Sequence, residues 1–147
     1  MKALLQRVSS AKVEVDGAVV GEIGIGLLVF LCAIKGDVEK DLNYIVKKVL
    51  QLRIFEDEAG KMNLSVMDIK GSALVVSQFT LAASTRKGNR PSFENAEAPA
   101  PAKAWYELFI QRLKDAGVTV QTGVFGEMMD VSLVNDGPVT IALDSKE

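Results

Sequence analysis

Asn135-Asp136-Gly137-Pro138-Val139-Thr140 is the stretch around which the chain is organised, because it interrupts what otherwise looks like a pair of strands. Gly137 has no Cβ, and Pro138 has neither a free φ nor an N–H, so the pair cannot be regular interior strand. Two interpretations stay open on these residues alone. One is a tight turn between a strand ending near Val134 and a strand beginning at Val139. The other is a turn that presents backbone carbonyls to a ligand, with a cis peptide bond as one form.

The composition predicts a globular protein. The chain has 147 residues, of which 48% are hydrophobic, so we expect a single domain over residues 1–147 with a substantial core. The apolar runs end well before the length of a membrane span, and the N-terminus lacks the order of a signal peptide. We therefore expect a soluble, cytoplasmic protein without a membrane partner.

The chain contains no histidine. Its absence removes the Ser-His-Asp and Cys-His triads and the commonest transition-metal ligand, and no carboxylates have ligand spacing. We predict that no metal and no cofactor is needed. An enzyme of this composition must use backbone dipoles, hydroxyls, carboxylates, lysines or the substrate's own groups. The net charge of −2 argues against a broadly basic nucleic-acid coat but allows a local phosphate-binding patch.

The run from Leu27 to Ile34 has no polar face, which predicts a central strand buried on both sides. It contains Cys32, the only cysteine, so no internal disulfide can form. A buried, inert thiol is expected there, because no histidine is present to activate it.

The remaining pattern predicts an α+β fold with two main helices. Residues 2–15 and a segment through Val19 and Ile23 form a hairpin with an Asp16-Gly17 turn. Asp37 is expected to cap the first helix, and Pro99 and Pro101 precede the second. Further strands are predicted over 73–81, 118–120, 128–134 and 139–143. The apolar faces of the two helices are predicted to comprise Leu42, Ile45, Val46, Val49 and Leu50, and Trp105, Leu108, Phe109 and Leu113.

A second candidate site is Ser77-Gln78-Phe79-Thr80-Leu81, at the end of a strongly apolar segment. In a regular strand Gln78 and Thr80 share one face while Ser77 and Phe79 point the other way. Buried polar atoms need hydrogen-bond partners, which either the protein or a ligand can supply. Both possibilities stay open for these residues.

A third candidate lies in residues 82–100, which have almost no periodic pattern. Long loops of this kind inside a compact domain are usually functional or disordered. This loop carries Arg86, Lys87 and Arg90, the one concentrated cationic cluster in the chain. Solvated charge and phosphate binding are the two interpretations.

The chain resembles the D-aminoacyl-tRNA deacylase family through Ser-Gln-Phe-Thr-Leu at 77–81 and Asn-Asp-Gly-Pro-Val-Thr at 135–140. The opening Met-Lys-Ala-Leu-Leu-Gln-Arg-Val and Arg-Lys-Gly-Asn-Arg-Pro at 86–91 extend the likeness over nearly the whole chain. The resemblance implies a homodimer with a β-barrel-like fold and a pocket at the subunit interface. The implied activity is hydrolysis of the ester that joins a D-amino acid to the 3′-terminal adenosine of tRNA.

The resemblance also assigns roles to residues. Ser77, Gln78, Phe79 and Thr80 are the implied catalytic segment, and backbone N–H groups at Phe79 and Thr80 would stabilise an oxyanion. A Thr80 hydroxyl nucleophile is the competing mechanism.

Carried over in the same way, Gly137-Pro138 is cis and enters the partner subunit's pocket, where it selects chirality. Arg86, Lys87 and Arg90 are expected to contact tRNA phosphates. Other classes remain open: a non-catalytic RNA- or nucleotide-binding module, a structural dimer, and editing of an L-aminoacyl or glycyl ester as in threonyl-tRNA synthetase editing domains.

Overall fold

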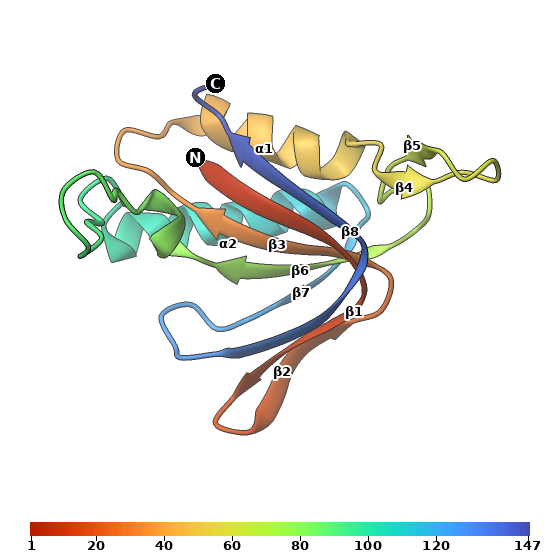
Figure 1. Cartoon of the computed structure of the whole chain (residues 1–147), viewed down its shortest axis with the longest axis horizontal. Coiled ribbons are helices and arrows are strands. Elements are labelled where there is room, and N and C mark those ends of the chain that lie inside the picture. Colours follow the sequence, from red (N-terminus) through yellow and green to blue (C-terminus); the bar gives the residue numbers. More distant parts are fainter.

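The computed structural model describes residues 1–147 and has one large sheet with two α-helices packed against it (Figure 1). The strands of the large sheet are β1 (Lys2–Val15), β2 (Ala18–Ile23), β3 (Gly26–Cys32), β6 (Ser72–Ser77), β7 (Thr119–Thr122) and β8 (Asp130–Asp144). The helices are α1 (Glu39–Gln51) and α2 (Pro99–Asp115). The smaller elements are the hairpin of β4 (Phe55–Glu56) and β5 (Met62–Leu64) and the 3-10 helix η1 (Phe79–Ala82).

The sheet curls until it nearly closes on itself. Its strand order is β2-β1-β3-β6-β7, with β8 paired along the other edge of β1. β3, β6 and β7 run parallel, and the pairs made by β1 are antiparallel. β2 then approaches β7 so closely that a Cβ on Gly21 would lie 2.4 Å from the Thr122 carbonyl oxygen. The predicted β-barrel-like α+β fold with two helices is therefore confirmed.

The curled sheet has a hydrophobic core on each of its faces. The larger core lies between the sheet and the two helices, and Phe109 and Leu113 of α2 are completely buried in it. The smaller core fills the inside of the curl, and its buried members are Val8, Ala11, Val13, Ile23, Leu28, Leu74 and Val76. β3 contributes Leu27 and Val29 to the first core and Leu28 to the second. This confirms a central strand buried on both sides.

Local turn chemistry explains the first hairpin. Asp16 and Gly17 have φ values of +50° and +80°, as a two-residue type I′ turn requires. The β1–β2 ladder therefore begins with Val15 opposite Ala18, as the sequence predicted.

The second helix, α2, packs against the sheet through the larger core. Pro occupies the first turn of α2, and Gly117 follows the helix with a φ of +97°. Trp105 packs half-buried against the larger core, while Tyr106 is buried more deeply. The Tyr106 hydroxyl donates a hydrogen bond to the Val75 carbonyl at 3.1 Å, and burial raises the pKa of Tyr106 to about 12.

Two predicted strand boundaries were wrong. The strand expected over 73–81 ends at Ser77, where the chain turns into η1. The short hairpin of β4 and β5, which contains Asn63, was not among the predicted strands. The two strands expected at 128–134 and 139–143 are one strand, β8, whose halves both pair with β1. The tight-turn interpretation of 135–138 is therefore wrong, because the chain does not reverse there.

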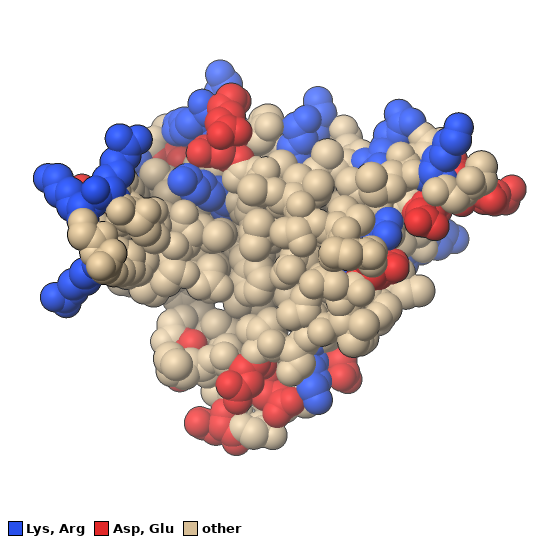
Figure 2. All heavy atoms as spheres, viewed as in Figure 1, with Lys and Arg blue, Asp and Glu red and all other residues tan.

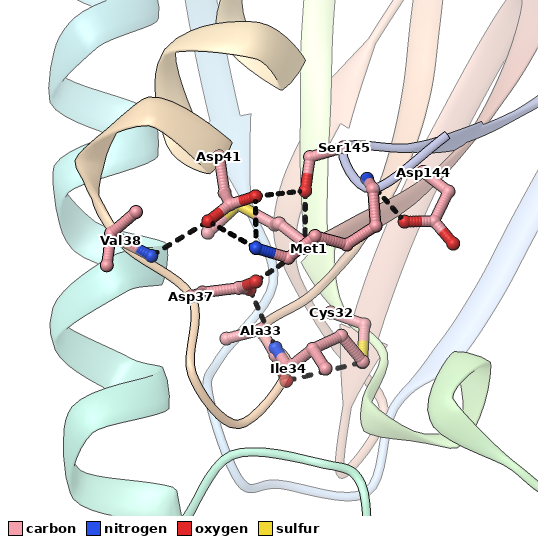
Figure 3. A network of polar contacts seen from close by, with 10 residues as sticks. Met1, Cys32, Ala33, Ile34, Asp37, Val38, Asp41, Asp144 and Ser145 are labelled. Carbon is pink, nitrogen blue, oxygen red and sulfur yellow. Dashed lines mark hydrogen bonds and ion pairs between the residues drawn. The ribbon is translucent and has the colours of Figure 1, made fainter.

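Asp37 does not cap α1, which begins after Val38. Instead, Asp37 is buried and binds the α-ammonium group of Met1 at 2.7 Å and the Ile34 N–H at 2.8 Å (Figure 3). The side chain of Asp41 accepts a hydrogen bond from the Val38 N–H and thereby supports the first turn.

The C-terminal tail joins the same network. Ser145 donates a hydrogen bond to Asp41 at 2.7 Å and accepts one from the Met1 ammonium at 2.8 Å (Figure 3). The ammonium group of Lys146 lies 3.0 Å from the Asp41 carboxylate. This network fastens the start of β1 and the end of β8, which are paired neighbours, to the start of α1. Neither α-helix is long and apolar enough to span a membrane.

Candidate active site

The Ser77–Thr80 segment forms where β6 leaves the sheet. Ser77 is the last residue of β6 and lies opposite Leu31 of β3. The Gln78 N–H still donates to the Leu31 carbonyl at 2.8 Å, and the chain then turns into η1. The expectation that Gln78 and Thr80 share a strand face is thus corrected: they are joined by a side-chain hydrogen bond from Gln78 Nε2 to Thr80 Oγ1.

The start of η1 exposes main-chain donors. The first N–H groups of a helix have no partner within it, and here these groups belong to Phe79 and Thr80. Both residues are exposed, Phe79 by 57%. Such N–H groups, held by the fold, can bind a negatively charged oxygen.

Two neighbours hold the Phe79 backbone and ring. The Phe79 ring meets the Phe93 ring edge to face, with centroids 5.2 Å apart. The Cys32 thiol donates a weak hydrogen bond to the Phe79 carbonyl, with sulfur and oxygen 3.5 Å apart. Burial raises the pKa of Cys32, so the thiol stays protonated and able to donate. The expected buried thiol is confirmed, and it lies directly under the candidate site.

The Gly137–Pro138 segment forms a bulge in β8, and its peptide bond is cis. Gln6 pairs with Thr140 and Val8 with Asn135, so five residue steps along β8 match two along β1. Gly137 has a φ of +138°, and a Cβ there would lie 2.8 Å from the Val139 nitrogen. The bulge therefore requires glycine.

Arg7, opposite the bulge, was not identified from the sequence. Its side chain is buried; Nε donates to the Asp136 carbonyl at 2.9 Å, and Nη1 donates to the Ile54 carbonyl at 2.7 Å. The Asp136 carboxylate lies 3.5 Å from the same guanidinium. A signal was present, because Arg7 follows Ala3 and Leu5 on the buried face of β1 at the strand period of two.

The two candidate segments lie at opposite ends of the parallel pair β3–β6. Arg7, which holds the bulge, pairs with Leu27, and Leu27 pairs with Ala73 at the start of β6. From Ala73 to Ser77 the strand advances roughly 13 Å, and η1 lies beyond. In Figure 1 the green η1 segment is at the left, whereas the middle of β8 crosses at the right. Within a single chain, Gly137–Pro138 therefore lies apart from Phe79 and Thr80.

The cationic loop, in contrast, is next to η1. Ser84 and Ser92 exchange two backbone hydrogen bonds, at 2.8 and 2.9 Å, and so close the loop at its base. Arg86, Lys87 and Arg90 are exposed within it and form no ion pair. Figure 2 shows basic side chains gathered at this end of the molecule.

A cavity of about 580 Å³ lies beside the bulge. Arg7 and Asp136 line it together with β4, Ile25 just before β3, and residues 69–71 just before β6. No group of three or more carboxylate or thiol side chains is placed to hold a metal ion.

The fold and the site define a histidine-free α+β protein whose candidate active groups are exposed main-chain atoms at a strand end and in a strand bulge. The chain belongs to the D-Tyr-tRNA(Tyr) deacylase family, whose sequence profile matches residues 4–144. It is 58% identical to a D-aminoacyl-tRNA deacylase of Aquifex aeolicus (strain VF5), over 100% of this chain and 99% of that protein. A D-aminoacyl-tRNA deacylase of Persephonella marina (strain DSM 14350 / EX-H1) is 59% identical over 99% of both chains.

Solved structures share this fold. A structure titled c-Myc DNA Unwinding Element Binding Protein superimposes with a TM-score of 0.94, at 43% identity over 98% of both chains. A probable eukaryotic D-amino acid tRNA deacylase shares the fold, with a TM-score of 0.83 at 18% identity over 97% of both chains.

Proposed function

We propose that this protein hydrolyses the ester bond of D-aminoacyl-tRNA and releases the free D-amino acid and tRNA. The observation that carries the proposal is the exposed start of η1, in a histidine-free chain that belongs to the deacylase family. Neither a non-catalytic RNA-binding module nor editing of L-aminoacyl esters is favoured by a specific feature of the site.

The chemistry needs positioning more than a strong base. An aminoacyl ester is already activated, and the ribose 2′-hydroxyl beside it can help to orient water. The N–H groups of Phe79 and Thr80 would bind the oxyanion as it develops, an effect worth roughly 3–4 kcal/mol per donor. Ser77 and Gln78 set the geometry of this turn, and the hydrogen bond from Gln78 holds the Thr80 side chain.

The active enzyme is a homodimer in this proposal. Since Gly137–Pro138 lies at the far end of β6 from Phe79 in its own chain, it acts in the pocket of a second copy. A two-fold axis makes the exchange reciprocal, so that each dimer has two composite sites.

Chirality would be selected by a wall of main-chain atoms. Inverting the α-carbon exchanges its hydrogen and side chain, so a rigid surface close to that carbon admits one enantiomer and collides with the other. Carbonyls at Gly137–Pro138 can form such a surface without contacting the amino-acid side chain beyond it. Glycyl esters should then be accepted as well.

The direct test incubates the protein with D-tyrosyl-tRNA, L-tyrosyl-tRNA and glycyl-tRNA and follows loss of the ester. We expect rapid loss of the D-ester, measurable loss of the glycyl ester and survival of the L-ester. Binding of tRNA without loss of any ester would instead indicate a non-catalytic RNA-binding module. Preferential loss of the L-ester would establish editing of L-aminoacyl esters.

A mixing experiment tests the shared site. Variants Gly137→Ala and Phe79→Pro, the latter removing one η1 N–H, should each be inactive alone. In a randomly exchanged equal mixture, half the dimers contain both variants, and each of these has one intact site of two, so activity should recover to about a quarter of wild type. No recovery, with dimer exchange verified by mass spectrometry, would contradict the composite site.

A further inference from the structure

α1 carries a second cationic surface, apart from the 86–90 loop. It comprises Lys35, in the turn before the helix, and Lys40, Lys47 and Lys48 on the helix; these four lysines are named here the basic face. Lys35, Lys40 and Lys47 are exposed, and Lys48 is half-buried with its ammonium 5.6 Å from the centre of the Tyr44 ring. None of the four lysines forms an ion pair within the chain.

The acidic residues of α1 do not neutralise this face. Glu39 is paired with Arg112 of α2 at 2.6 Å. Asp41 is buried and paired with Lys146. The solvent-facing charge of α1 is therefore positive, although the chain as a whole has a net charge of −2.

The basic face adjoins the segment that returns from the cationic loop. The Lys35 N–H donates to the Asn95 carbonyl at 3.0 Å, and Ile34 forms a β-bridge with Ala96 on the returning side of that loop. From Lys40 to Lys48 the helix advances roughly 12 Å. Figure 2 shows basic side chains spaced along the upper edge of the molecule from the loop at the left to the right-hand side, with an acidic cluster among them at the upper left.

The opposite end of the molecule is acidic. Glu14, Asp16 and Glu22 lie around the β1–β2 hairpin, and Asp130 is opposite Glu14 in the β1–β8 ladder. Figure 2 shows acidic side chains gathered on this lobe, with a basic group among them. A polyanion is thus attracted to one side of the protein and repelled from the other.

We propose that the basic face binds the phosphate backbone of the double-stranded acceptor stem of tRNA, while the 86–90 loop holds the single-stranded 3′ end. A nucleic-acid duplex presents phosphates every few ångströms, so a face of this length meets several of them. Lysines with flexible stems suit contacts with phosphate that carry no sequence information. This inference rests on the proposed deacylase function.

The test compares two double variants of equal charge change. Lys40→Gln with Lys47→Gln removes two cations from the basic face. Lys12→Gln with Lys114→Gln removes two from elsewhere, one in the acidic lobe and one near the end of α2. Each variant is assayed on D-tyrosyl-tRNA and on 3′-(D-tyrosyl)adenosine, which carries the ester but no phosphate.

For the basic-face variant on tRNA we expect kcat/KM to fall about tenfold at low salt. The slope of log(kcat/KM) against log(salt concentration) should become shallower by about 1.5. The rate of this variant on the adenosine ester, and both rates of the control variant, should match wild type. The acceptor-stem contact would be overturned if the basic-face variant kept the wild-type salt slope on tRNA, or if the control variant lost as much kcat/KM on tRNA as the basic-face variant. Either result would leave the deacylase function standing. A wild-type protein that hydrolyses neither ester would overturn the deacylase function and this inference with it.

Discussion

Arg7 and Asp136 are joined by a hydrogen bond of 2.9 Å from the guanidinium Nε to the main-chain carbonyl that precedes Gly137. The same buried guanidinium binds the Ile54 carbonyl through Nη1. A single side chain therefore connects β1 to the bulge in β8 and to the segment after α1.

Arg7→Lys should disrupt this connection. A lysine ammonium cannot reproduce a planar fork that bonds two carbonyls in different directions, and a buried charge without its partners is costly. We expect the free energy of unfolding to fall by about 2–5 kcal/mol, together with a loss of D-ester hydrolysis, measured by urea unfolding and by the deacylation assay. Arg53→Lys is the control, because Arg53 is exposed and donates a hydrogen bond to the Asn63 carbonyl. If Arg53→Lys lowers the free energy of unfolding as much as Arg7→Lys, the loss reflects any arginine-to-lysine exchange and not the buried position of Arg7.

Thr80→Ala should lower the rate without abolishing it. The substitution removes the hydrogen bond from Gln78 but keeps the main-chain N–H that binds the oxyanion in the proposed mechanism. A net hydrogen bond of about 0.5–1.5 kcal/mol corresponds to a roughly 2- to 10-fold fall in kcat. Denaturing mass spectrometry of the enzyme during turnover gives the decisive reading: an acyl group trapped on Thr80 establishes the nucleophilic mechanism instead.

Neutralising the cationic loop should weaken tRNA binding without changing the choice of enantiomer. In the triple variant Arg86→Gln, Lys87→Gln and Arg90→Gln, the salt slope of tRNA binding should decrease by about 2–3. The ratio of D- to L-ester hydrolysis should stay at its wild-type value, because the loop does not contribute the chiral wall. An unchanged slope would mean that the three cations are only solvated.

Chelation should leave the activity intact. The chain has no histidine, and no set of its carboxylate and thiol side chains is placed to hold a metal. Deacylation rates measured after exhaustive treatment with EDTA should equal those of untreated enzyme. Loss of activity that one added divalent metal restores would refute the metal-free mechanism.

Asp41 should make the protein sensitive to acid. Burial alone would raise the pKa of Asp41, but hydrogen bonds from the Val38 N–H, Ser145 and Lys146 hold it well below its ordinary value. A carboxylate whose pKa is depressed in the folded state stabilises the fold above its unfolded pKa of about 4, and this stabilisation is lost as the pH falls further.

Urea unfolding at a series of pH values checks this expectation. Between pH 5 and 2, Asp41→Asn should lose less stability than wild type, although it starts from a lower value. Asp130→Asn, which alters an exposed carboxylate without an ion pair, should follow the wild-type curve. Parallel wild-type and Asp41→Asn curves would assign the acid sensitivity to other groups.

Elements governed by local chemistry were predictable from the sequence. The Asp16-Gly17 turn needs only two residues with positive φ, and β3 is a continuous apolar run between glycines. The hydrophobic spacing of α1 likewise depends on its own residues. In each case the signal lies within the element itself.

Elements that depend on distant partners were not predictable in the same way. β8 is a single strand because β1, more than a hundred residues earlier, pairs with both sides of its bulge. An apolar run such as 73–81 does not mark where a strand gives way to a 3-10 turn, and here that place decides which N–H groups are exposed. Asp37 looked like a cap because its partner, the Met1 ammonium, is 36 residues away in the chain.

The bulge in β8 has an evolutionary consequence. If substrate chirality is judged by main-chain atoms at Gly137 and Pro138, no side chain there can be exchanged to relax or reverse the preference gradually. A Cβ at Gly137 would lie 2.8 Å from the Val139 nitrogen, and a substitution at Arg7 would remove the hydrogen bond to the Asp136 carbonyl. Mutation at either position should therefore destroy the site and not alter its preference. The enantiomer preference should therefore be far more resistant to mutation than the tolerance for different amino-acid side chains.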